Sequence, residues 1–264
     1  MALFAKKEKY VPIQGLTGAA TDYNIYTPTV KEKILWFIIG LIVSGDVLYV
    51  FYENLIVSVI AGAVCGVVYI PMRTKQMIKK RKQRLNIQFR GLLDALSTSI
   101  GAGKNVFDAF GGAAEDLSVQ FSQDSDIVRE VNVIRSGLNN NIQIENLLLN
   151  FAERSGLDDV KNFANVFATC YKKGGNIKDV IKNTATIIGD KIEIKMELDT
   201  MVAGQTSEQA IMMVMPVIFI VIMKSMGGGL IDLKSPIGVL SVTIALAIFV
   251  AAYFVSKKIL NIKL

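Results

Sequence analysis

The stretch GAGKN, residues 101–105, contains the glycines and the lysine that a phosphate-binding loop uses. Such a loop also needs a glycine five positions before its last glycine and a Ser or Thr hydroxyl after the lysine to bind magnesium. This chain has Thr98 and Asn105 at those two positions. The residues before the stretch follow a helical pattern instead of a strand pattern. We therefore interpret it as a capped turn between two helices.

Other side chains that could do chemistry are few. The chain has no histidine, which is the commonest general base and metal ligand in proteins. Its two cysteines, Cys65 and Cys170, provide neither a disulfide framework nor a zinc site. Asp158 and Asp159 stand where a helix is expected to begin, and acids are favoured there by the helix dipole. We predict no enzymatic activity, no cofactor and no metal site.

The capped turn has a second copy further along the chain. The string LLDALSTSIGAGKNVFDAF, residues 92–110, aligns with FANVFATCYKKGGNIKDVI, residues 163–181. Each string has an apolar helix, a glycine turn, an asparagine placed to cap the next helix and an aspartate at its third position. A left-handed glycine is expected to close the helix before the second turn. The pattern predicts two pseudo-repeated helix-turn-helix units. Their turns are the predicted partner-contact residues: Lys104, Asn105, Asp108, Lys172, Lys173, Gly174, Gly175, Asn176 and Asp179.

Four apolar stretches predict that these turns belong to a membrane protein. Apolar residues make up 52% of the chain, more than a soluble domain uses. A helix needs about 20 apolar residues to cross a bilayer. The stretches that qualify are 34–52, 55–71, 209–226 and 236–256. They form two predicted transmembrane hairpins, 34–71 and 209–256.

A run of cations predicts the orientation, because lysine and arginine are retained on the cytoplasmic side of spans. This run, which we also expect to meet anionic lipid, consists of Arg73, Lys75, Lys79, Lys80, Arg81, Lys82 and Arg84. The terminal segments 1–33 and 257–264 are basic as well. If the chain crosses the membrane an even number of times before its central segment, the cationic run and both terminal segments all lie in the cytoplasm. We predict a multi-pass protein of the cytoplasmic (inner) membrane with both termini cytoplasmic.

The central segment, residues 72–208, is predicted to be a cytoplasmic bundle of about six helices. Its first apolar stripe has helical spacing and consists of Leu85, Phe89, Leu92, Leu93, Leu96 and Ile100. Breaks follow at 101–105, 122–125, 137–141, 155–156 and 174–176. The fold class is thus an all-α integral membrane protein. Residues 85–207 hold 12 basic and 16 acidic residues, which argues against nucleic-acid binding. Residues 11–30 are expected to be irregular, with no role assigned.

Residues 85–216 resemble the type II secretion F domain, in particular that of the tight-adherence pilus assembly proteins TadB and TadC. The family's helix, Gly-Gly, polar residue, aliphatic residue and further helix match Gly174, Gly175, Asn176 and Ile177. The resemblance implies an inner-membrane platform for assembling an Flp-type pilus. It also implies the partners, which are a cytoplasmic secretion ATPase, a paralogous F-domain membrane protein and pilin subunits.

Two alternatives remain open, a small membrane transporter and another kind of membrane scaffold. A transporter needs ionisable residues well inside its spans. This chain has only Asp46 and Lys224, both near span ends. The glycine- and alanine-rich run VIAGAVCGVV, residues 59–68, predicts a homo- or hetero-oligomer, because small residues let helices approach closely.

Overall fold

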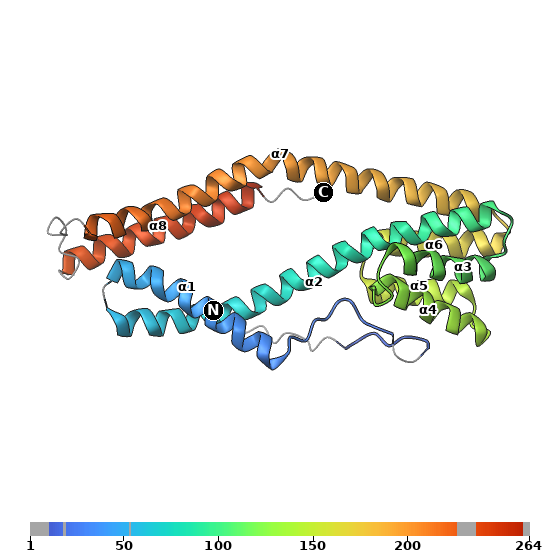
Figure 1. Cartoon of the computed structure of the whole chain (residues 1–264), viewed down its shortest axis with the longest axis horizontal. Coiled ribbons are helices and arrows are strands. Elements are labelled where there is room, and N and C mark those ends of the chain that lie inside the picture. The colour runs from blue at the N-terminus through green and yellow to red at the C-terminus, as the bar shows by residue number, and fades with distance from the viewer. Residues whose placement is uncertain (1–10, 18–19, 53, 226–235, 261–264) are drawn as a thin grey trace. The chain divides into compact units, whose positions relative to one another are not determined.

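A computed structural model of the chain describes residues 11–17, 20–52, 54–225 and 236–260 (Figure 1). These residues form helices and connecting turns and contain no strand, so the predicted all-α class is confirmed. The helices are α1 (Val30–Tyr52), α2 (Leu55–Gly101), α3 (Val106–Gln120), α4 (Asp126–Asn139), α5 (Ile144–Ser155), α6 (Asp158–Lys173), α7 (Ile177–Ser225) and α8 (Pro236–Leu260). Every predicted break in the central segment contains a junction between two of these helices, although the break at 137–141 begins inside α4, which ends at Asn139.

The chain divides into two compact units. The bundle unit consists of Met1–Tyr26 with Gln76–Ile192, and the span unit consists of Thr27–Lys75 with Glu193–Leu264. Helices α2 and α7 therefore each contribute to both units. In this division α7 leaves the bundle unit after Ile192, and the last buried residue among its described side chains is Gly189. The bundle unit also includes the described N-terminal residues before Thr27.

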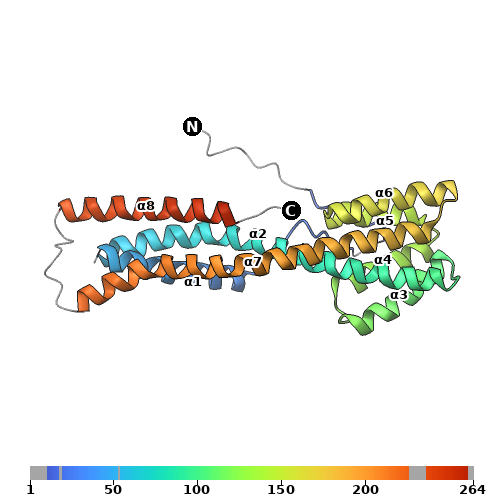
Figure 2. The ribbon, with the colours of Figure 1, turned by 90° about the horizontal axis from the view of Figure 1, so that it is seen from above.

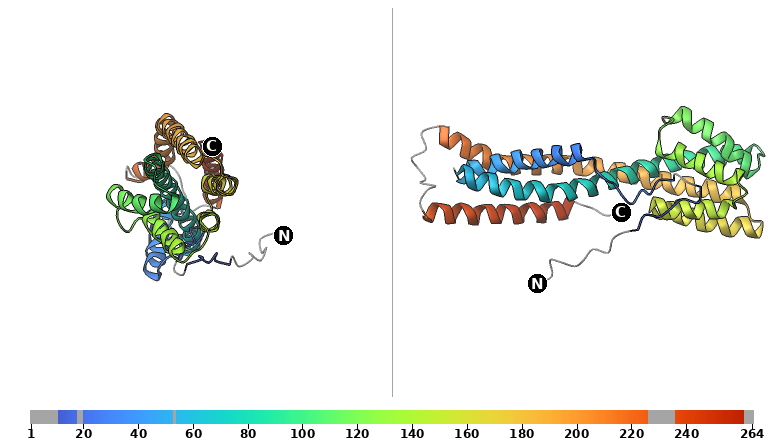
Figure 3. Two further views of the ribbon diagram at one scale, coloured as in Figure 1. Left: turned by 90° about the vertical axis from the view of Figure 1, so that its right-hand side faces the viewer. Right: turned by 90° about the horizontal axis from the view of Figure 1, so that it is seen from below.

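The core of the bundle unit follows the predicted apolar stripe. On α2, Leu85, Phe89 and Leu96 are fully buried, and Ile100 packs against the same core. The ring centroid of Phe89 lies 5.5 Å from that of Phe163 and 6.1 Å from that of Phe151. Successive helices reverse direction, so the α2–α3, α4–α5 and α6–α7 turns lie at one end of the bundle (Figures 2 and 3). We call this end the distal face, defined as residues 101–108, 140–145 and 171–179.

The span unit holds the apolar helices. By length and composition, four helices of the described chain could cross a membrane, which are α1, the first part of α2, the last part of α7 and α8. In addition, α1 contacts α8, where the hydroxyls of Tyr52 and Thr243 lie 3.0 Å apart. This agrees with two apolar hairpins in the sequence.

Glycines let α1 and α2 approach closely. A Cβ atom added at Gly66 would lie 3.0 Å from the carbonyl oxygen of Phe37, and one at Gly62 would lie 3.1 Å from that of Leu41. Both glycines are buried. The run 59–68 was our basis for predicting an oligomer, but its two glycines serve contact within one chain. They therefore do not support that prediction.

Candidate functional site

The turn between α2 and α3 is built as the sequence predicts. Gly103 adopts a positive φ of 85°. Asn105 caps α3, because its Oδ1 accepts a 2.8 Å hydrogen bond from the Asp108 amide. Its Nδ2 donates to the Asp108 carboxylate at 2.7 Å. The interpretation of this glycine-rich stretch as a capped turn is confirmed.

The turn between α6 and α7 repeats this arrangement. Gly174 has the left-handed conformation, with φ of 70°, and the Gly175 amide donates to the carbonyl of Cys170 at 2.8 Å. These features close α6 as a glycine C-cap does. Asn176 Nδ2 then donates to the Asp179 carboxylate at 2.6 Å, and the Asp179 amide approaches Asn176 Oδ1 at 3.4 Å. The predicted caps are therefore present at both turns.

The structure brings the two turns together on the distal face. A Cβ atom added at Gly101, where α2 ends, would lie 3.7 Å from the Lys178 side chain at the start of α7. Lys104, Lys172 and Lys173 are all exposed. The predicted partner-contact residues thus form one accessible surface, whose aspartates are engaged by the capping asparagines and whose lysines have no ion pair among the described residues.

A cavity of about 380 Å³ opens on the distal face. Residues from three turns line it, including Val106, Phe107, Leu138, Ile142, Glu145 and Tyr171. Phe107 and Tyr171 are about half exposed, whereas Glu145 is buried with 6% of its surface exposed. Asn141, at the edge of the cavity, has a positive φ of 59°, which asparagine tolerates better than most residues. Sequence reasoning did not identify this cavity.

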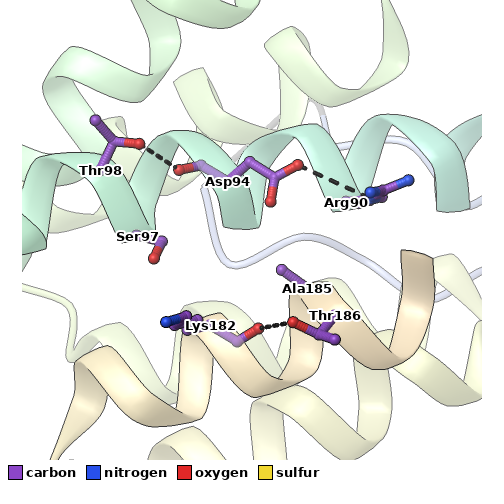
Figure 4. A pocket seen from close by; sticks show the side chains of 7 residues that line it. All are labelled: Arg90, Asp94, Ser97, Thr98, Lys182, Ala185 and Thr186. Carbon is purple, nitrogen blue, oxygen red and sulfur yellow. Dashed lines mark hydrogen bonds and ion pairs between the residues drawn. The ribbon is translucent and has the colours of Figure 1, made fainter. Parts of the chain in front are cut away.

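A second cavity, of about 320 Å³, lies between α2 and α7 (Figure 4). Its polar side chains mostly engage their own helix. Arg90 and Asp94 form a 3.9 Å ion pair one turn apart, and the Thr186 hydroxyl donates to the Lys182 carbonyl at 3.1 Å. Both members of the ion pair are exposed, so the contact is weak. We assign this groove no ligand.

The N-terminal residues 11–17 and 20–26, which we call the strap, pack on the bundle. Tyr23 is fully buried, its amide donates to the Arg154 carbonyl at 2.9 Å, and its hydroxyl donates to Glu130 at 2.8 Å. Arg154 and Glu130 form a buried two-bond ion pair with distances of 2.8 and 2.7 Å. The strap's own Thr21 carbonyl accepts from Arg154 at 2.9 Å. Sequence reasoning assigned this segment no role.

Arg81 connects the strap to α4. Its guanidinium lies 4.6 Å from the centroid of the Tyr23 ring and forms two hydrogen bonds with Asp126, at 3.0 and 2.7 Å. Burial acts to raise the pKa of Asp126, but Arg81 and then Arg129 outweigh it and hold that pKa below its usual value. Burial, followed by the nearby Glu130 carboxylate, raises the pKa of Tyr23. The neutral tyrosine and the ionised aspartate are therefore the favoured folded forms.

The cationic run divides into two groups. Arg81 and Lys82 bind other residues of the bundle unit: Arg81 pairs with Asp126, and Lys82 Nζ donates to Asn24 Oδ1 at 2.6 Å. Burial lowers the pKa of Lys82, although nearby acids oppose the shift. Lys75, Lys79, Lys80 and Arg84 are exposed, and Arg73 stacks over Tyr69 at 5.6 Å. Lipid contact therefore remains a prediction for these five residues.

The described residues hold no group of three or more His, Cys, Asp or Glu side chains that could bind a metal ion. The distal face offers exposed lysines and the half-exposed rings of Phe107 and Tyr171. No family model, curated protein or solved structure matches the chain.

Proposed function

We propose that this chain is a platform protein of the cytoplasmic membrane in a tight-adherence pilus or type II secretion-like machine. In this role the bundle unit binds a cytoplasmic secretion ATPase, and the span unit acts on pilin subunits in the bilayer. The proposal starts from the sequence resemblance to the F domain. The observation that carries it furthest is the distal face, where both copies of the repeated capped turn lie side by side.

Contacts of the strap support the proposed topology. Tyr23 precedes α1, whereas its partners Glu130 and Arg154 follow the apolar part of α2. Residues in contact must lie on the same side of a membrane. If α1 and α2 both cross the bilayer, the chain returns to its starting side, as an even number of crossings requires. The exposed cations after the proposed second crossing favour the cytoplasm as this side.

The long helices provide a physical route from the ATPase to the pilin. Both α2 and α7 are continuous, with 47 and 49 residues, and each runs from an apolar segment into the bundle unit. Their bundle ends, Gly101 and Ile177, belong to the distal face. An ATPase bound there would act on helices that extend into the spans, and packed helices move as discrete bodies by shifts or rotations.

The first test is purification of the full chain from its native membrane in mild detergent, followed by mass spectrometry of bound proteins. We expect a secretion ATPase and a second F-domain protein to be recovered. Recovery of neither, from folded and abundant protein, would overturn the platform proposal. Solute-dependent transport in vesicles would then favour the transporter alternative.

A charge reversal on the distal face sharpens the test. Lys172→Glu with Lys173→Glu should reduce the recovered ATPase at least tenfold, because the reversal repels an acidic contact. Lys161→Glu, an exposed position on the same helix but near its other end, should not. Equal recovery with all variants would show that the ATPase binds elsewhere.

A further inference from the structure

One side of α7 is uncovered where the helix approaches its apolar segment. Residues 193–208 belong to the span unit and precede the predicted span, which begins at residue 209. Two of the side chains here, Ile194 and Met201, are 48% and 66% exposed, and a Cβ atom added at Gly204 would meet nothing within 4 Å. We call this side the acidic face; its residues recur at helical spacing, are all exposed, and are Glu193, Ile194, Glu197, Met201, Gly204 and Glu208.

The acidic face has no cation of its own. Its three glutamates form no ion pair among the described residues. Lys195 lies on the other side of α7, about 200° around the helix from Glu193. Four residues after Glu193 stands another acid, Glu197, and like charges at this spacing destabilise a helix. The face therefore gathers negative charge and apolar surface that the helix itself does not compensate.

The complementary charge lies on α2. Residues 72–84 contain no acid. Four exposed cations of this stretch form no ion pair among the described residues, and these are Lys75, Lys79, Lys80 and Arg84. Lys80 and Arg84 are four residues apart, the same spacing as Glu193 and Glu197. Apolar surface accompanies these cations as well, because Met72 and Met77 are 39% and 38% exposed.

The two sets of charges lie at similar distances from the predicted spans. At a rise of 1.5 Å per residue, Arg84 is about 20 Å along α2 from residue 71, and Glu197 is about 18 Å along α7 from residue 209. Headgroups extend only about 5–8 Å beyond the hydrocarbon, and salt screens a charge over about 8 Å. Lipid is therefore within reach of Lys75 but too distant to pair with Arg84. Copies of the chain in one bilayer hold these segments at equal depth.

We propose that the acidic face of α7 binds the cations of α2 in a second copy of this chain. The number of the residue rises away from the predicted span in α2 and toward it in α7, so the two helices pair antiparallel. Glu197 then lies opposite Arg84, and Gly204 lies opposite Gln76. Complementary charge selects this register, and the contact covers Ile194 and Met201. The inference rests on the proposed crossing of the bilayer by both helices, and it does not require the platform role.

The first experiment is disulfide cross-linking between two differently tagged full-length copies in isolated native membranes, with Cys65 and Cys170 replaced by alanine. One copy carries Gln76→Cys and the other carries Gly204→Cys, both about 8 Å along the helix from the predicted span. Copper phenanthroline should produce a dimer that contains both tags. Thr206→Cys, on the opposite side of α7, is the matched control and should give several-fold less dimer.

Three outcomes of this cross-linking would overturn the proposal. The first is the absence of a dimer with both tags. The second is an equal yield from Gly204→Cys and Thr206→Cys, which would indicate random collision. The third is a disulfide that forms only when both cysteines are in one chain, which would show that the two helices pair within a copy.

Charge reversal tests the pairing itself. Glu197→Lys should lower the yield of the mixed-tag dimer at least about threefold, whereas Asp199→Lys, an exposed acid on the other side of the same helix, should not. Arg84→Glu in the copy with Gln76→Cys should lower the yield alone and restore it when combined with Glu197→Lys in the other copy. Equal yields from all these variants, or no restoration, would overturn the pairing.

The contact and the platform role can fail separately. A mixed-tag dimer of a chain that recovers no ATPase would retain the contact between α2 and α7 and reject the platform role. ATPase recovery by a chain that forms no such dimer would do the opposite.

Discussion

The bundle unit and the span unit bury their apolar side chains in different ways. Every residue of the main hydrophobic core lies in the bundle unit. In the described span unit, Trp36 is the only large apolar side chain that is buried, whereas Ile60, Phe219 and Leu240 are each 63% exposed. The bundle can therefore fold by excluding water from its own side chains. The span unit needs lipid or other apolar surroundings to cover its surface.

This difference means that similar substitutions should have unequal effects in the two units. In the bundle, removal of a buried polar group leaves its partner buried in a low-dielectric interior without a hydrogen bond or ion pair. In the span unit, the tight contacts are between backbones. The single tryptophan, Trp36, lies in α1, so its fluorescence reports on the span unit alone. Circular dichroism follows both units.

The largest effect is expected from Arg154→Met. This change leaves Glu130 buried without its ion-pair partner, and breaking a buried pair costs about 3–5 kcal/mol. Urea unfolding in detergent, followed by circular dichroism, should show the loss, while the Trp36 transition stays in place. Arg129→Met provides the control, because the Arg129 side chain is 54% exposed, so its loss should cost at most about 1 kcal/mol, and Asp126 keeps both hydrogen bonds from Arg81. Equal losses of unfolding free energy in Arg154→Met and Arg129→Met would contradict the larger contribution that we assign to the buried pair.

Tyr23→Phe should have the next largest effect. It removes the hydroxyl that donates to Glu130, and a hydrogen bond to a charged group contributes about 1.5–3 kcal/mol. The strap should become easier to cleave by limited proteolysis before the bundle unfolds. Tyr171→Phe changes an exposed tyrosine of the same unit and should leave the cleavage rate unchanged. A strap equally resistant in both variants would show that Tyr23 does not hold it.

In the span unit, Gly66→Ala should cost about 1–2 kcal/mol, because the new methyl group meets the Phe37 backbone and separates α1 from α2. The Trp36 transition should move to lower denaturant concentration. At Gly204, in the span part of α7, an added Cβ would have no neighbour within 4 Å. Gly204→Ala should therefore be neutral or stabilising, as alanine favours helix. A larger loss of stability for Gly204→Ala than for Gly66→Ala would contradict close packing of α1 against α2.

A smaller loss is expected from Asn105→Ala, which removes the cap of α3. An N-cap residue contributes about 1 kcal/mol. Circular dichroism should record a destabilisation of this size, and Asn105→Asp should restore most of it. Full stability in the alanine variant would mean that the lysine-bearing turn holds its shape without the cap.

The smallest effect concerns alkaline pH. The folded bundle favours neutral Tyr23, so its stabilising contribution is complete below the ordinary tyrosine pKa of about 10 and falls as pH rises through the raised folded pKa. At pH 10.5 the loss should be about 0.8 kcal/mol relative to pH 8, by linkage. Comparing the wild-type chain with Tyr23→Phe at both pH values isolates this term. An identical change in stability with pH in the two chains would show that Tyr23 ionisation does not contribute to it.

Much of the helix order could be predicted from the sequence, because its signals are local. The glycine turns, the capping asparagines and the stripe that includes Leu85 and Phe89 all act within a few residues of one another. The positions of the helix ends followed from these patterns. The exposed apolar spans could likewise be predicted from length and composition alone.

The strap and the cavity depend on distant residues, which explains why they were missed. Tyr23 contacts Glu130 across 107 positions, and turn-forming residues surround it in the sequence. Glu145 has the pattern of an ordinary first-turn acid, and only packing of three turns buries it. Gly62 and Gly66 show a motif that fits contact within a chain and contact between chains equally well.

The strap also constrains the order of events during synthesis. The strap is synthesised early, but the arginine and glutamate that receive Tyr23 are made more than 100 residues later. Until α5 has been translated, the aromatic ring has no binding place in the nascent chain. Closure of the strap is thus a late step, because it can occur only after α4 and α5, which carry Glu130 and Arg154, have been made.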